Sequence, residues 1–164
     1  MAVVSASIED ILHIIYWKMA GLSDAVGAVI TGDARPNRLT EDIIKIARGA
    51  KVDAKIIEDL SDIFTAYRDL ATKRNQCIHW TWNAPKGKRI VVEPPTYKTG
   101  AQPVTFTLKE MRTLADDLVW IETRLDVHAM SPAELQAAKS RTKNANIYVP
   151  TPWLDKPPPP SAKQ

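Results

Sequence analysis

Residues 52–78 read VDAKIIEDLSDIFTAYRDLATKRNQCI and form the longest regular pattern in the chain. Mostly apolar side chains recur there at intervals of three and four residues, which is the period of one face of an α-helix. The stripe consists of Ile56, Leu60, Ile63, Tyr67, Leu70, Arg74 and Ile78. We therefore expect one long helix with an arginine on its packing face. A guanidinium on that face requires an anionic partner or a solvated cleft, because burying its charge alone is costly.

Helix-start signals divide the rest of the chain. Serine or threonine residues that suit the N-cap position occur at Ser7, Ser23, Thr40 and Thr107. The start at Thr40 leaves residues 32–38 as a predicted loop, and Thr107 with Glu110 predicts a capping box. The late helix, 107–130, carries a wide apolar stripe of its own. We expect it to pack antiparallel against residues 52–78.

Two segments interrupt this helical pattern. Residues 89–93 and 104–106 have strand character, and prolines and a glycine separate them, so residues 84–106 are predicted to form a hairpin-like insertion. Ser131 and Pro132 open a short predicted last helix. Six of the twelve prolines fall between 150 and 160. The sequence thus predicts a mainly α fold: an up-and-down bundle of four to five helices over residues 1–141, followed by a disordered proline-rich tail at 142–164.

Composition narrows the class of protein. A chain of 164 residues with a net charge of +3 fits a single domain that tolerates a polyanionic partner without requiring one. The single cysteine, Cys77, excludes an intrachain disulfide and suits a reducing cytoplasm, and we interpret it as a packing residue. No stretch has the pattern of a signal peptide or a membrane span. No motif predicts a metal site or a cofactor.

One short motif carries most of the functional information. Arg74, Asn75 and His79 close the long helix. Asn75 and His79 are four residues apart, so the amide is able to orient the imidazole ring. Arg74 and His79 differ by roughly 140° around an ideal helix, so they meet only if the last turn unwinds.

This motif, at the end of a long helix in a small bundle, resembles the HEPN superfamily, over about residues 8–127. The resemblance implies a homodimer of helical bundles. It also implies a metal-independent endoribonuclease that acts on single-stranded RNA by Arg/His acid–base chemistry, of the kind found in toxin–antitoxin and phage-defence systems, with a cognate antitoxin or another protein as partner. Other members of the superfamily are non-catalytic dimerisation or binding modules. At Thr81 the sequence departs from the tyrosine often found two residues after the histidine.

The proposed chemistry follows from the residue types. Histidine titrates near neutral pH and serves as a general base, while arginine stabilises the charge on a reacting phosphate. Structural alternatives remain open. In the first alternative, Arg74 pairs with a buried carboxylate such as Asp116 or Asp117. In the second, His79 donates to a carbonyl at the helix end.

A second set of residues suits nucleic-acid binding. Aromatic and basic side chains follow the motif closely, and such mixtures stack on bases and contact phosphates. The set consists of Lys73, Trp80, Trp82, Lys86, Lys88 and Arg89. The competing interpretation is that the tryptophans pack the hairpin onto the bundle and that the cations lie in solvent.

Overall fold

The computed structural model describes residues 1–83, 89–131 and 133–134. Within these ranges the chain forms five helices and a small three-stranded sheet, so the predicted mainly α class is confirmed. The proline-rich tail predicted at 142–164 lies outside the described residues, as does the predicted helix beyond Glu134. No helix in the described part of the chain combines the length and the apolar character needed to cross a membrane.

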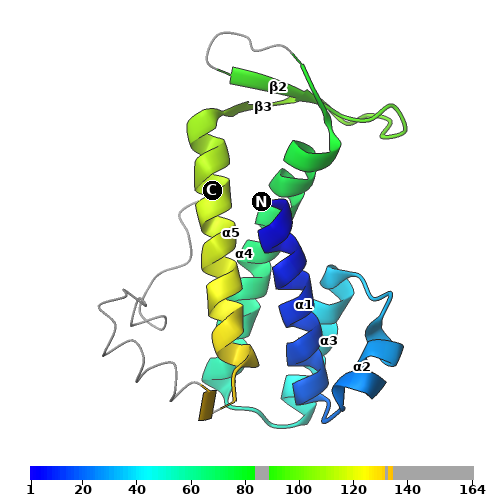
Figure 1. Ribbon diagram of the computed structural model, residues 1–164, viewed down its shortest axis with the longest axis vertical. Helices are drawn as coiled ribbons and strands as arrows, with labels where there is room; N and C mark the ends of the chain where they lie inside the picture. Colours follow the sequence, from blue (N-terminus) through cyan, green and yellow to red (C-terminus); the bar gives the residue numbers. More distant parts are fainter. Residues whose placement is uncertain (84–88, 132, 135–164) are drawn as a thin grey trace.

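Three long helices form the centre of the bundle. They are α1 (Ala2–Met19), α4 (Ala54–His79) and α5 (Leu108–Ala129), which lie side by side in Figure 1. Contacts between their ends fix the directions. Asp59, near the start of α4, contacts His128, near the end of α5, so these two helices are antiparallel as predicted. Ser5 of α1 contacts Arg74 of α4, so α1 is also antiparallel to α4.

Two shorter helices cover one side of this trio. They are α2 (Asp24–Thr31) and α3 (Pro36–Gly49), and α3 packs against both α1 and α4. The middle of the apolar stripe predicted for α4 forms the core together with α1, α3 and α5, whereas its two end members, Ile56 and Ile78, are exposed. Leu60, Ile63 and Leu70 of that stripe are each at most 1% exposed.

Helix starts were predicted well in some places and wrongly in others. The capping box at Thr107 is confirmed, with reciprocal hydrogen bonds between Thr107 and Glu110. The start predicted at Ser7 is wrong, because α1 already begins at Ala2. The loop predicted at 32–38 is wrong in its second half, because α3 begins at Pro36, whose fixed φ suits a first helical position. Thr40 is buried inside α3, where its hydroxyl donates to the carbonyl of Asn37.

The predicted hairpin is confirmed and is larger than expected. Strands β2 (Arg89–Glu93) and β3 (Val104–Thr107) pair antiparallel, with Ile90 opposite Phe106. A third strand, β1 (Thr81–Trp82), pairs with the end of β2, so the sheet begins before the insertion predicted at 84–106. The sheet covers the end of the bundle where α4 ends and α5 begins (Figure 1). Its buried residue Val92 belongs to the same core as the helices.

Candidate functional site

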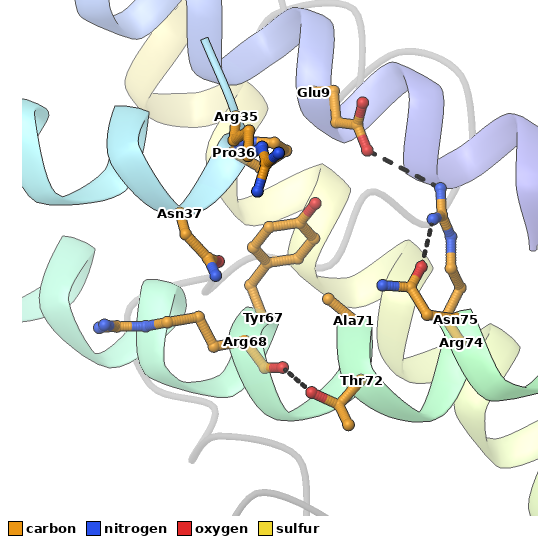
Figure 2. Close-up of a pocket in the computed structure, with 10 residues that line it drawn as sticks. All are labelled: Glu9, Arg35, Pro36, Asn37, Tyr67, Arg68, Ala71, Thr72, Arg74 and Asn75. Carbon is orange, nitrogen blue, oxygen red and sulfur yellow. Dashed lines mark hydrogen bonds and ion pairs between the residues drawn. The ribbon is translucent and has the colours of Figure 1, made fainter. Parts of the chain in front are cut away.

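The C-terminal half of α4 borders a cavity of about 270 Å³. Glu9 of α1 lines one side of this cavity, and residues 35–37, at the start of α3, line another. The floor consists of α4 side chains, including Tyr67 and Arg74 (Figure 2).

Arg74 is held by neighbours on two helices. Its Nε donates to the hydroxyl of Ser5 at 2.8 Å, and its Nη1 donates to the side-chain oxygen of Asn75 at 2.7 Å. Its Nη2 lies 3.8 Å from a carboxylate oxygen of Glu9, and the arginine side chain is only 17% exposed. The predicted need for an anionic partner is therefore met by Glu9. Asp116 and Asp117 were the wrong candidates, because α1 rather than α5 faces this side of α4.

His79 is the last residue of α4, and its side chain is exposed. No hydrogen bond or ion pair within the described part of the chain involves its ring. The helix stays regular up to His79 and changes to an extended conformation only at Trp80, so the last turn does not unwind. The amide oxygen of Asn75 accepts from Arg74, and no hydrogen bond joins Asn75 to His79. One chain therefore does not bring Arg74 and His79 together.

The described members of the candidate nucleic-acid set differ in exposure. Trp80 is only 8% exposed and packs in the core, with the ammonium group of Lys98 5.7 Å from its ring centre. Trp82 is 48% exposed, and its indole nitrogen donates to the carbonyl of Cys77 at 2.8 Å. Trp82 thereby satisfies a carbonyl at the end of α4, where helix carbonyls lack internal partners.

Two basic members of this set, Lys73 and Arg89, lie within the described residues. Lys73 is exposed on α4. Arg89 of β2 forms an ion pair with Glu110 at 3.5 Å. Lys86 and Lys88 lie outside the described residues. Cys77, interpreted from sequence as a packing residue, is buried, and burial raises the pKa of its thiol.

Tyr67 is a residue of the cavity that sequence reasoning treated only as core. Its side chain is 3% exposed, and its hydroxyl has no hydrogen-bond partner among the described residues. Among those residues, every fully buried side-chain nitrogen or oxygen has a hydrogen-bond partner. The Tyr67 hydroxyl has none, so it is not fully buried, and the cavity that it lines gives access to it. Burial, together with the charge of Glu9, raises the pKa of Tyr67 to about 12, so the phenol is a hydrogen-bond donor at neutral pH. A signal existed in the sequence: Tyr67 and Arg74 are two helical turns apart on one face.

The cavity is positively charged overall. Arg35, Arg68 and Arg74 line it, against the single carboxylate of Glu9. The start of α3 adds to this charge, because no side chain caps it and no acidic residue lies in its first turn. Within the described residues no group of three histidine, cysteine or acidic side chains is placed to share a metal ion. The arrangement therefore suits an anion bound by arginine, amide and hydroxyl groups.

A second ionic cluster lies near the other end of α4. The carboxylate of Asp59 forms an ion pair with Arg124 of α5, and its second oxygen lies 2.7 Å from Nε2 of His128. The side chains of Arg124 and His128 are 8% and 14% exposed. This cluster joins α4 to α5 inside the bundle.

Comparison with known proteins adds no further identification, because no family model, curated protein or solved structure matches this chain.

Proposed function

We propose that this chain is a HEPN-like protein that cuts single-stranded RNA without a metal ion, with Arg74 as the phosphate-binding residue and His79 as the general base. The observation that carries the proposal is the contrast between two side chains that are five residues apart. Arg74 is oriented by Ser5 and Asn75, whereas the imidazole of His79 is open to solvent at the last residue of the same helix.

The reaction uses the RNA's own 2′-hydroxyl as nucleophile. His79 accepts the hydroxyl proton while the 2′-oxygen bonds to the adjacent phosphorus. Arg74 stabilises the negative charge that builds up on the phosphate oxygens. The bond to the 5′-oxygen breaks, that oxygen takes up a proton, and the products carry a 2′,3′-cyclic phosphate and a 5′-hydroxyl.

A complete site requires two copies of the chain. Arg74 and His79 of one copy lie roughly 140° apart around α4, so they do not reach the same phosphate. In a symmetric dimer with the two α4 ends facing each other, Arg74 of one protomer meets His79 of its partner. A monomer in solution at tens of micromolar would remove this model.

One observation favours a second candidate function, a non-catalytic binding module. Glu9 already lies 3.8 Å from the guanidinium of Arg74, which lowers the positive charge available to a phosphate. In this alternative Arg74 positions α1 against α4, and His79 is a solvated end residue. A toxin–antitoxin or phage-defence role, and an antitoxin partner, remain predictions from the resemblance.

The deciding experiment is cleavage of single-stranded RNA in EDTA by the purified chain and its variants. We expect His79→Ala and Arg74→Ala each to abolish most of the cleavage, with Arg112→Ala, an exposed arginine on α5, as the matched control. Equal cleavage by the wild type and His79→Ala would identify a contaminant and leave the binding-module function.

Mixing the two inactive variants tests the composite site directly. In a heterodimer of Arg74→Ala and His79→Ala, one of the two sites is intact only if each site takes its arginine and histidine from different protomers. With random exchange of subunits, about a quarter of the wild-type rate should return. No recovery, with heterodimers demonstrated in the mixture, would contradict the composite site.

A further inference from the structure

The hydroxyl of Tyr67 needs a partner that the described residues do not supply. It reaches the cavity from a side chain that is only 3% exposed, and Figure 2 shows the ring rising from α4 toward α1 and the start of α3. A buried polar group without a partner is costly, and a bound group or water in the cavity removes that cost. RNA cleavage by Arg74 and His79 has no use for this hydroxyl.

The groups around the Tyr67 hydroxyl favour a negatively charged ligand as its partner. The uncapped start of α3 directs the positive end of its dipole at the cavity, and helix starts of this kind bind phosphate. Arg35 stands at that start, and Arg74 lines the opposite side. The side-chain amide of Asn37 also lines the cavity and offers neutral donors (Figure 2).

We infer that the cavity between α1, the start of α3 and α4 binds a phosphate monoester, with Tyr67 and Arg35 as its principal contacts. The volume of about 270 Å³ suits a small group, because it lies just below the roughly 300–1,000 Å³ of sites for drug-sized ligands. A monoester fits better than a backbone diester, because its second negative charge matches the excess of arginines and its free oxygens accept several hydrogen bonds. The inference goes beyond RNA cleavage, since it requires neither His79 nor a second copy.

Titration calorimetry at low ionic strength, with inorganic phosphate and a nucleoside 5′-monophosphate as probes, tests this site. Tyr67→Phe removes one oxygen and keeps the packing, so the variant should fold, and its affinity should fall about tenfold. Arg35→Gln should lower the affinity by a similar factor. Tyr16→Phe on α1 and Arg38→Gln on α3 make the same chemical changes outside the cavity, and both should bind as the wild type does.

The same measurement separates a specific site from general attraction of anions. If Tyr67→Phe and Arg35→Gln bind phosphate as tightly as Tyr16→Phe and Arg38→Gln, the inference is overturned. Absence of wild-type binding at tens of millimolar phosphate overturns it as well. His79→Ala should keep wild-type phosphate binding, so failure of the cleavage proposal leaves this inference standing.

A pair of short RNAs identifies the source of the phosphate. Tighter binding of a 5′-phosphorylated oligonucleotide than of the free nucleotide supports an RNA end, and the reverse order supports a small molecule. Equal binding of 5′-phosphorylated and 5′-hydroxyl oligonucleotides would exclude an RNA end as the source, and weaker binding of the free nucleotide than of the 5′-hydroxyl oligonucleotide would contradict the inference itself.

Discussion

The two ends of α4 each carry an arginine–carboxylate pair to a neighbouring helix, yet they differ in exposure and distance. Near the start of the helix, Asp59 is in close contact with Arg124 and His128 of α5, and its side chain is 20% exposed. Near the end, the guanidinium of Arg74 and the carboxylate of Glu9 are 3.8 Å apart, and Glu9 is 41% exposed. The first cluster is closed and joins two helices. The second is open beside a cavity and leaves room for another anion.

The largest expected effect is on the closed cluster. Asp59→Ala removes this carboxylate from beside Arg124, whose charged side chain is mostly buried. Because a buried charge that loses such a partner is costly, we expect the free energy of unfolding to fall by about 3 kcal/mol. Urea denaturation measures the loss. Asp62→Ala, at an exposed position less than one turn later, is the matched control and should change stability little. A loss below about 1 kcal/mol for Asp59→Ala would show that the cluster contributes little.

The stability of the protein should depend on pH because His128, a member of the same cluster, titrates differently in the folded and unfolded chains. Burial, with a further contribution from the charge of Arg124, lowers the pKa of His128 from 6.5 to about 4, even though Asp59 is its neighbour. Between these two values the unfolded chain binds the proton better than the folded one, so stability falls as pH falls. The contribution of this group should drop by about 2 kcal/mol from pH 7 to pH 5.

Comparing His128→Gln with the wild type isolates that contribution, since other groups also titrate in this range. The variant should lose less stability between pH 7 and pH 5 than the wild type does. His79→Gln, at the exposed end of α4, is the matched control. The same pH slope in His128→Gln and the wild type would contradict a neutral, buried His128.

The open pair should matter less for stability. Arg74→Ala removes hydrogen bonds to Ser5 and Asn75 at a partly solvated site, and we expect a loss of about 1 kcal/mol in urea denaturation. Arg112→Ala serves as the control. A loss as large as that of Asp59→Ala would make Arg74 a structural residue and weaken both functional proposals.

The smallest expected effect is a change in phosphate affinity at the cavity beside the open pair. Glu9→Gln removes the only carboxylate among the described residues that line the cavity, so the affinity for inorganic phosphate should rise about threefold. Asp10→Asn, at the next and exposed position of α1, should have less effect because it does not line the cavity. A decrease in affinity for Glu9→Gln would mean that Glu9 orients Arg74 rather than competing with the anion.

Regular patterns in the sequence predicted the elements that depend on local preference and periodicity. The buried middle of the α4 stripe, the capping box at Thr107 and the pairing of β2 with β3 were all predictable from the sequence. The starts of α1 and α3 could not, because Ser7 and Thr40 are good caps in isolation, whereas both helices begin earlier and bury Ser5 and Leu39 ahead of those positions. The strand at 81–82 is too short to show a period and exists only because β2 lies beside it.

The candidate site also has features that local sequence patterns predict and features that they do not. Arg74 could be singled out from sequence alone, because a charge on an apolar stripe must be compensated, whichever neighbour provides the compensation. That the partner is Glu9, that Asn75 turns toward Arg74 rather than His79, and that Tyr67 reaches a cavity were decided by the tertiary structure. Periodicity along one helix determines which face is buried. It does not determine which other helix covers that face or where two helices diverge, since those depend on contacts between residues distant in sequence.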